Sequence, residues 1–400
     1  MIDFGNTAFV LICAAMVCFM IPGLAFFYCG LVRRKNALTI MMQSFVAMGV
    51  VAVVWFVCGF SLAFGKDVGG VIGGLEYAFL NGVGLEPNGT YAASIPFLAF
   101  FLFQLMFAVI TPALITGAFA DRVSFKSYLI FLAAWCPLVY APCAHWVWGG
   151  GFLQQMGVVD FAGGIVIHCS AGMAALAAIR FVGKRRIRPD EDTSPYSVPY
   201  IALGTGILWF GWFGFNGGSA LAANGIAAVA FSNTAIAGAT AMLTWMLMSW
   251  RKTGHPSIVE AMTGIVAGLA AVTPASGYVA PWAAALIGVA AGVICRLAIR
   301  IPGRRGLDDA LDVWGVHGVG GMLGAILVGV FAQAGFGGLD GLIAGNMHLL
   351  LVQILAVVIV AAYSFVVTFV MLKAIQHFIP VKVSEVEELA GLDGIFHEAA

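Results

Sequence analysis

Charged residues are scarce in this sequence. Only 10% of its 400 residues are charged, whereas 62% are hydrophobic and the mean hydropathy is +1.00. Soluble globular domains usually carry about 25% charged residues. The composition therefore excludes an ordinary soluble fold and predicts a chain that lies mostly in lipid. Basic and acidic residues are equal in number, 19 of each, so the net charge gives no indication of a nucleic-acid partner.

The motifs of metal, redox and catalytic sites are missing as well. The eight cysteines lie within or at the edge of apolar segments and none forms a C-x-x-C pair, so we expect small buried apolar residues. The sequence contains no nucleophile motif, cofactor-binding loop or metal-ligand cluster. We therefore expect neither an enzyme nor a bound metal or cofactor. Residues 1–6 are too short for the basic region of a signal peptide, so the first apolar run is expected to be a mature helix.

Long apolar runs make up most of the chain. A bilayer core of about 30 Å requires about 20 apolar residues per helix, and charges, prolines and polar glycine-rich stretches separate the runs. The sequence predicts an all-α integral membrane protein with eleven transmembrane helices. Their expected limits are 7–31, 37–64, 96–119, 127–147, 160–181, 198–216, 225–250, 258–275, 279–300, 313–333 and 347–378.

The basic residues give an independent test of this division, because Lys and Arg collect in cytoplasmic loops. They follow every second span, so that 18 of the 19 lie on one side and only Lys66 lies on the other. An odd number of spans then predicts an N-terminus outside and a C-terminus in the cytoplasm. The expected location is the cell (cytoplasmic) membrane, which the chain crosses many times.

A weak internal repeat relates the two halves of the chain. His168 is followed by Gly172 with the same spacing as His317 by Gly321, and an aspartate precedes each histidine by eight residues: Asp160 and Asp309. If five helices form each repeat (about 7–181 and 198–333), the second copy is inverted relative to the first. The helix 347–378 then stands outside the repeat, residues 1–380 form the membrane domain, and residues 381–400 form a cytoplasmic tail.

Inverted repeats place a pathway at their interface near the membrane midplane, which points to His168 and His317. An unsatisfied histidine in hydrocarbon costs several kcal/mol. The alternatives are helix-packing histidines bonded to backbone carbonyls, or a metal site. No Cys, Asp or Glu lies at ligand spacing on these helices, and their matched placement favours a functional pair.

Asp160 and a group of aromatic residues are the other candidates. The carboxylate of Asp160 can cap the fifth helix and can also attract a cation, and the sequence does not separate these roles. Most aromatic residues at membrane edges form interface belts. The run WFGFNGGS at 212–219, however, combines aromatic rings, close-packing glycines and the hydroxyl of Ser219. An ammonium ion on a desolvated ring gains about 2 kcal/mol, so this run can bind such a cation.

Five segments resemble the Amt/Mep/Rh family of ammonium transporters and fit its Amt/Mep branch better than its Rh branch. They are IPGLAFFYCGLVRRKN (21–36), YAPCAHWVWGGG (140–151), DFAGGIVIH (160–168), WFGWFGFNGGS (209–219) and DDALDVWGVH (308–317). The resemblance spans essentially the whole chain. It implies a homotrimer in membrane lipid in which each subunit has its own pore for ammonium or ammonia.

The resemblance also implies roles for individual residues. Phe107, Trp148 and Ser219 look like the external recruitment site, with Phe103 and Asp160 beside it. Phe107 and Phe215 resemble a stacked gate. His168 and His317 look like the twin histidines of the pore, and Trp212 looks like a residue of its wall.

The cost of moving a bare cation through a dry lumen, tens of kcal/mol before compensation, suggests a mechanism. Ammonium can lose a proton near the gate, cross as ammonia and leave the proton to be relayed or shared by the two histidines. Potassium cannot.

Two further functions stay open. An ammonium sensor would use the same binding site with little conduction, and an Rh-type conduit would pass ammonia or carbon dioxide. Gly391-Leu392-Asp393 and His397 match the tail with which the family meets a PII-type signalling protein, although the residues between them differ. A signalling domain fused at the C-terminal side is the alternative partner.

Overall fold

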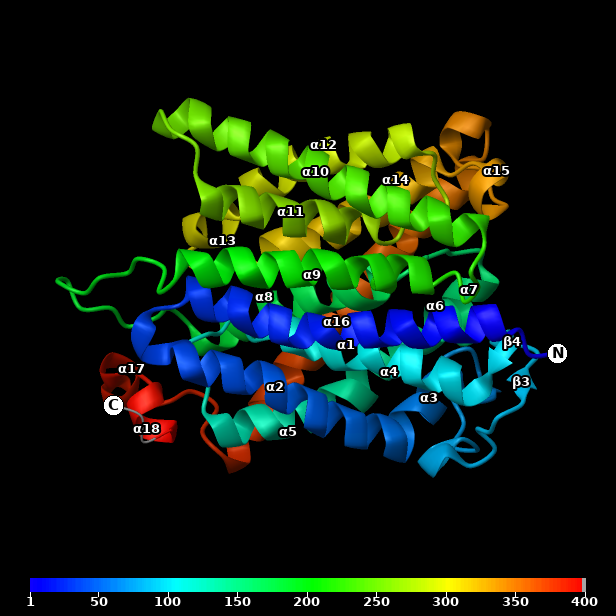
Figure 1. Ribbon diagram of the computed structural model, residues 1–400. Helices are drawn as coiled ribbons and strands as arrows, with labels where there is room; N and C mark the ends of the chain where they lie inside the picture. Colours follow the sequence, from blue (N-terminus) through cyan, green and yellow to red (C-terminus); the bar gives the residue numbers. More distant parts are fainter. Residues whose placement is uncertain (398–400) are drawn as a thin grey trace.

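The computed structural model describes residues 1–397, and its long helices run side by side (Figure 1). These are α1 (Phe4–Leu31), α2 (Ala37–Val54), α4 (Phe97–Ile115), α5 (Phe125–Trp135), α8 (Ser170–Val182), α9 (Val198–Gly218), α10 (Gly225–Thr253), α11 (Ile258–Val272), α12 (Pro281–Ala298), α14 (Val319–Phe331) and α16 (Met347–Phe378). Shorter helices are α3 (Phe60–Phe64), α6 (Ala141–Trp148), α7 (Phe152–Gln155), α13 (Arg300–Arg304), α15 (Ala334–Gly337), α17 (Glu385–Ala390) and α18 (Asp393–Phe396).

Single helical turns join several of these helices. The π-helical turns are η2 (Trp55–Gly59), η4 (Cys136–Tyr140), η5 (Gly164–Cys169) and η6 (Trp314–Gly318), and the 3-10 turns are η1 (Arg34–Asn36), η3 (Ala78–Leu80) and η7 (Leu342–Ala344). Joined in this way, ten helices within residues 1–397 are long and apolar enough to cross a membrane. The predicted eighth span is present as α11, but at 15 residues it is shorter than a typical span. The count of eleven transmembrane helices therefore stays a prediction.

Polar residues begin several of the helices where the sequence changes from loop to apolar run. Side-chain oxygens of Ser124, Ser197, Asn224 and Ser257 accept hydrogen bonds from the first turns of α5, α9, α10 and α11. Close packing follows from small residues. A Cβ on Gly204 of α9 would lie 2.3 Å from the backbone nitrogen of Phe27, so glycine allows α1 and α9 to pack closely along their length.

The segment between α3 and α4 departs from the all-α prediction. It contains two short antiparallel pairs, β1 (Asp67–Val68) with β2 (Ile72–Gly73), and β3 (Pro87–Asn88) with β4 (Ala92–Pro96). They lie at the end of the bundle that carries the N-terminus, here named the N end, and the tail helices α17 and α18 lie at the opposite end, here named the C end (Figure 1).

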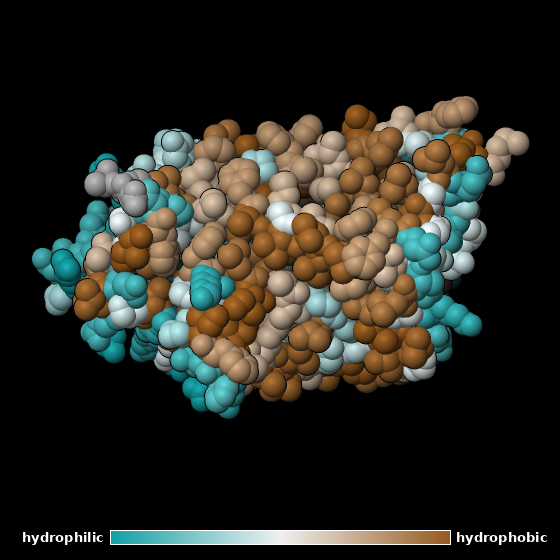
Figure 2. Space-filling view, turned by 90° about the horizontal axis from the view of Figure 1, so that it is seen from below, coloured by the Kyte–Doolittle hydropathy of each residue, from teal (hydrophilic) through white to brown (hydrophobic). Residues whose placement is uncertain are grey.

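The surface has the form expected of a membrane protein. Figure 2 shows a broad hydrophobic band between hydrophilic residues at both ends of the bundle. Large apolar side chains such as Phe19, Leu203, Phe210 and Leu355 are exposed within the long helices. Such a continuous apolar surface needs a lipid or protein neighbour.

The tail, predicted for residues 381–400, folds back onto the C end; residues 398–400 lie outside the described part. The backbone of Val383 donates to the carbonyl of Arg122, and Ser124 donates to the carbonyl of Val381. Ser384 and Glu387 form a capping box at the start of α17. Direct hydrogen bonds therefore connect the tail to the loop that precedes α5.

Candidate functional site

His168 and His317 meet in the middle of the bundle. They lie on the π-helical turns η5 and η6, a helix type that is frequent at functional sites. Their Nδ1 atoms are 3.3 Å apart, and their rings are stacked with centroids 5.2 Å apart. Both residues are buried. The matched positions of the two histidines in the sequence thus correspond to direct contact in space.

The contact between the two Nδ1 atoms restricts the protons of the pair. A hydrogen bond needs one donor and one acceptor, so one Nδ1 carries a proton and the other does not. If both rings are neutral, one Nε2 is then bare and the other carries a proton. The Nε2 of His168 has no hydrogen-bond partner within residues 1–397. The pair can therefore present both a donor and an acceptor to a small guest molecule.

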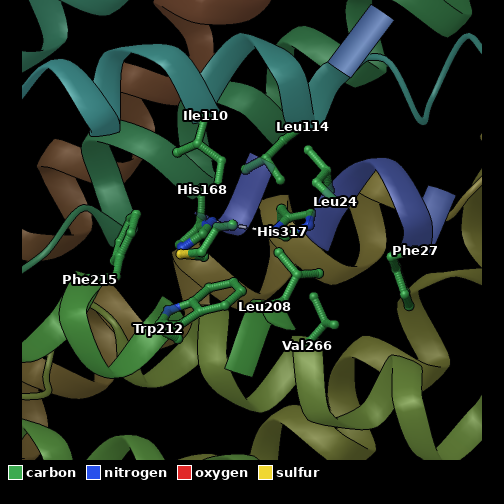
Figure 3. Close-up of a pocket in the computed structure, with 11 residues that line it drawn as sticks. Leu24, Phe27, Ile110, Leu114, His168, Leu208, Trp212, Phe215, Val266 and His317 are labelled. Carbon is green, nitrogen blue, oxygen red and sulfur yellow. Dashed lines mark hydrogen bonds between the residues drawn. The ribbon is translucent and has the colours of Figure 1, made fainter. Parts of the chain in front are cut away.

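The surroundings of the histidines are apolar. They line a narrow cavity, here named the histidine cavity. Its volume is about 10 Å³, which is enough for about one water molecule. Its wall includes Leu208, Trp212 and Val266 (Figure 3). Trp212 stacks against His168 with a centroid distance of 5.5 Å and donates its indole N–H to Thr273 at 2.8 Å. Because this donor is occupied, Trp212 offers the cavity mainly its ring face.

The five residues expected at the recruitment site lie together at the N end. They line one pocket of about 250 Å³, here named the N-end vestibule: Phe103, Phe107, Trp148, Asp160 and Ser219. The hydroxyl of Ser219 donates to the carbonyl of Phe215 at 2.9 Å, so its oxygen lone pairs stay available to accept from a cation. Aromatic faces and a free acceptor can together bind a small cation.

Phe107 and Phe215 separate this vestibule from the histidine cavity. Their ring centroids are 4.4 Å apart and their planes meet at 82°. The expectation of a stacked gate is wrong in this respect, because the rings meet edge to face, an arrangement that aromatic quadrupoles favour. Phe215 also lies 6.2 Å from the ring of His168. The two rings therefore form the partition between the vestibule and the paired histidines.

Asp160 is a helix cap, as predicted. Its two carboxylate oxygens accept hydrogen bonds of 2.7–3.0 Å from the backbone N–H groups of residues 163–166. Asp309 holds the corresponding position before η6, where it accepts from Val313 and Trp314. The helix of His168 begins at Gly164 rather than at residue 160 because the capping carboxylate lies in the preceding loop. The carbonyl of Asp160 also accepts the indole N–H of Trp148 at 2.8 Å.

Two polar residues that line these spaces, Gln104 and Asp312, are not among the residues predicted from the sequence. Gln104 lines the N-end vestibule, and its buried Oε1 has no partner within the described residues. Asp312 lines a pocket of about 90 Å³ at the C end, here named the C-end vestibule, together with His317. A signal was available for Gln104, since it is the only amide side chain of the apolar run 97–115. Asp312 has a left-handed φ of 59°, which the sequence does not reveal.

The described part of the chain contains no group of three or more His, Cys, Asp or Glu residues arranged to hold a metal ion. Instead, the N-end vestibule, the histidine cavity and the C-end vestibule follow one another through the bundle. His317 and Phe27 line both the second and the third of these spaces. A bundle of apolar helices around such a row of spaces defines a multi-pass integral membrane protein.

Comparison with known proteins identifies the family. The model of the Ammonium Transporter Family matches residues 8–400. Ammonium transporter Amt1 of Archaeoglobus fulgidus is 43% identical over 98% of both chains, and an ammonium transporter of Bacillus subtilis is 44% identical over 98% of this chain and 97% of its own. The chain therefore belongs to the ammonium transporter family.

Solved structures agree with this assignment. The crystal structure of Candida albicans Mep2 has a TM-score of 0.91 and 36% identity, and the match covers 96% of this chain and 88% of that one. A structure described as a sensor Amt protein also has a TM-score of 0.91, with 32% identity over 99% of this chain and 98% of its own. The same fold thus occurs in Mep2 and in a protein named as a sensor.

Proposed function

We propose that this protein is an ammonium transporter that carries ammonium-derived nitrogen from the N end, outside the cell, to the C end in the cytoplasm. The observation that supports the proposal most directly is the contact between His168 and His317 inside an apolar cavity, behind an aromatic vestibule. The distribution of basic residues supports this orientation. The relatives named as ammonium transporters support the choice of substrate.

Recruitment is the first step. Ammonium binds in the N-end vestibule against the rings of Phe107 and Trp148 and donates to the free lone pairs of Ser219. The unpaired Oε1 of Gln104 is a second acceptor. Phe103 supports this wall, because its ring packs edge to face on Phe107 with a centroid distance of 4.8 Å. Together these groups replace part of the hydration shell that the cation loses.

Deprotonation is the second step. A bare cation in the apolar histidine cavity would cost tens of kcal/mol before compensation, whereas ammonia is neutral and small enough for a passage the size of one water molecule. Ammonium therefore loses a proton near the partition of Phe107 and Phe215. His168 and His317 relay that proton, and Asp312 in the C-end vestibule can return it. Ions that cannot lose a proton, such as potassium, are excluded.

The proposal includes the architecture predicted above. Five helices form each of two inverted repeats, an eleventh helix follows, and three copies assemble into a homotrimer with one pore per subunit. The docked tail at the C end, with Asp393 at its centre, is the surface at which a PII-type protein or a fused signalling domain would act.

Currents from reconstituted protein test the proposal. Purified protein in liposomes on a solid-supported membrane should give a saturable current after an ammonium pulse and none after a potassium pulse. Replacing both pore histidines, His168→Leu with His317→Leu, should abolish the ammonium current. His255→Leu is the matched control, because His255 is exposed in the loop after α10. Undiminished currents in the double variant would contradict the relay.

A sensor is the second candidate, and the similarity to a structure named as a sensor Amt protein favours it. A sensor would bind ammonium at the same vestibule but conduct little. Calorimetric binding of ammonium without any current in liposomes would support this function over transport.

A further inference from the structure

His145 lies outside the row of spaces described above, yet it is completely buried. It belongs to α6, three residues before Trp148. Its Nδ1 is 2.9 Å from the carbonyl oxygen of Ala63, and its Nε2 is 2.9 Å from Oδ1 of Asp67. Both ring nitrogens therefore face oxygen atoms.

These two contacts fix the protons of the ring. A backbone carbonyl can only accept, so Nδ1 must carry a proton. A carboxylate also only accepts, so a second proton must lie between Nε2 and Asp67 for the contact at 2.9 Å to be a hydrogen bond. The pair therefore holds one proton more than neutral His145 beside ionised Asp67 would hold. Because the side chain of Asp67 is 36% exposed, that proton can exchange with external water.

The contact joins the β1–β2 loop to the helix that carries Trp148. The same loop accepts the indole N–H of Trp146 at the carbonyl of Val71, at 2.7 Å, and the backbone N–H of Phe152 at the carbonyl of Gly70. The carbonyl of His145 accepts from the backbone N–H groups of the glycines at 149 and 151. The backbone immediately after Trp148 is therefore anchored to His145.

We infer that His145 and Asp67 form a proton-dependent brace that positions Trp148, so that external pH sets the affinity of the N-end vestibule for ammonium. This inference rests on the proposed function. Without the shared proton the neutral ring can donate from only one nitrogen, so the lone pair of the other faces an oxygen of Ala63 or Asp67 at 2.9 Å, and the two acceptors repel each other. The loop then moves away from α6, Trp148 shifts over the vestibule, and ammonium binds less tightly. His145 and Asp67 are positioning residues, since neither lines the vestibule.

Other titratable groups near the brace do not account for the same dependence. The neighbouring groups on the surrounding elements are Lys66, Glu76, Tyr91, Asp160 and Tyr363. Lys66 and Glu76 are exposed, and water screens their charges. Burial raises the pKa of Tyr91 to about 12, so it stays neutral, and the hydroxyl of Tyr363 donates to Leu138. The carboxylate of Asp160 is held by four backbone N–H groups.

The test measures the KM of the ammonium current in proteoliposomes at external pH values from about 6 to about 9, with concentrations expressed as ammonium ion. The KM of the unaltered protein should rise by about fivefold or more over this range. The maximal current should change much less, because the histidine cavity is not altered. If the KM of the unaltered protein stays constant over this pH range, the inference is wrong, and no variant is needed to show it.

Asp67→Asn removes the shared proton while it keeps the contact with His145; of the two hydrogen bonds from Gly70, the shorter one, to Oδ1 at 2.8 Å, is lost. An asparagine N–H₂ can donate to Nε2 of a neutral His145, whose Nδ1–H still donates to Ala63, and the asparagine oxygen can accept from Gly70. The KM of this variant should lie within about twofold of the unaltered value at neutral pH and should not change with pH. Lys66→Gln, which alters the charge of the same loop outside the brace, should keep the pH dependence. A pH dependence that persists in Asp67→Asn overturns the inference.

Calorimetric binding of ammonium at the same pH values separates this inference from the proposed function. A pH-dependent Kd without current contradicts transport but supports the brace. A current with a pH-independent Kd and KM contradicts the brace alone. Absence of both binding and current contradicts both.

Discussion

Gly172 and Gly318 lie in direct contact where the helices of His168 and His317 cross. A Cβ on Gly172 would lie 2.1 Å from the Cα of Gly318, a backbone atom that cannot move without its helix. Gly172 follows His168 by one helical turn, and Gly318 is the neighbour of His317. The absence of side chains at these two positions therefore allows the histidine rings to approach within 3.3 Å.

Gly172→Ala should separate the two helices and break the contact between the histidines. We expect the ammonium current to fall by more than about tenfold, and the free energy of unfolding to fall by about 1–3 kcal/mol, the usual cost of overpacking. Gly318→Ala should be milder, because its Cβ would lie 3.1 Å from the nearest atom. Solid-supported-membrane currents and thermal unfolding in detergent measure the two effects.

Gly49→Ala is the matched control for these variants. Gly49 lies within α2, and a Cβ there meets no atom within 4 Å. This variant should retain both current and stability. A normal current in Gly172→Ala would mean that the contact between the histidines is not required.

The capping aspartates allow the structural and electrostatic roles of Asp160 to be separated. In Asp160→Asn an amide N–H₂ replaces one oxygen and faces two backbone N–H donors, so two of four hydrogen bonds are lost. We expect a loss of about 2–4 kcal/mol in the free energy of unfolding. Ammonium binding should weaken as well, because the carbonyl of Asp160 holds the indole of Trp148. Thermal unfolding and calorimetry measure these changes.

Asp309→Asn is the comparison at the start of η6. Asp309 caps η6 with two hydrogen bonds and does not line the N-end vestibule. This variant should lose about 1–2 kcal/mol of stability but keep the affinity for external ammonium. If Asp160→Asn were as stable as the unaltered protein and only bound ammonium less tightly, the charge of Asp160 would matter and its capping role would not.

A carboxylate of the tail caps the start of α2. Asp393 accepts hydrogen bonds of 2.8–2.9 Å from the backbone N–H groups of Leu38 and Thr39 and from the hydroxyl of Thr39. It thus acts as a capping residue for a helix more than 350 positions earlier in the chain. Asp393→Ala should release the tail, and cleavage of the tail in limited proteolysis should become about tenfold faster or more.

Glu385→Ala is the control for the tail. Glu385 belongs to the same segment, but its side chain is 62% exposed and its nearest basic group, on Arg186, is 3.9 Å away. Exposed pairs of this kind contribute little, so the rate of proteolysis should stay the same. Equal rates for Asp393→Ala and the unaltered protein would show that other contacts hold the tail.

Much of the fold could be predicted from the sequence because lipid imposes a simple rule on it. A membrane span must be about 20 apolar residues long and satisfy its own backbone, and so the runs that begin at residues 7, 96 and 347 correspond closely to α1, α4 and α16. The meeting of His168 and His317 could also be predicted, because equal spacing in two repeats implies equal depth in the membrane.

Other features depend on contacts between distant segments, which a local pattern does not contain. The two hairpins between α3 and α4 were not predicted, because their strands are short. Strands of this length do not show the alternation of apolar and polar residues by which longer strands are predicted. The vestibule residues came from the resemblance to a family. The edge-to-face angle of Phe107 and Phe215, the capping of α2 by Asp393 and the orphan acceptor on Gln104 all required coordinates.

A salt bridge at the C end gives a prediction about pH. Arg185 donates from Nε and Nη2 to the two carboxylate oxygens of Asp308, at 2.9 and 2.8 Å, and Arg122 lies 3.7 Å from the same carboxylate. Burial by itself raises the pKa of Asp308, but the hydrogen bond and charge of Arg185 outweigh it, so the pKa lies below its usual value. A carboxyl whose pKa is lower in the folded protein stabilises the fold above its unfolded pKa. That contribution is lost as the pH falls through the folded value.

Asp308→Asn should therefore reduce the free energy of unfolding by about 2 kcal/mol at neutral pH. The difference from the unaltered protein should shrink as the pH falls below about 4, the usual pKa of an unfolded aspartate, because the carboxyl then becomes neutral in both states. Thermal unfolding in detergent across this range measures the difference. Asp190→Asn, which changes an exposed carboxylate of the connection between α8 and α9, should have no effect at any pH. A difference that stays constant down to the lowest pH would mean that the charge of Asp308 does not stabilise this end of the bundle.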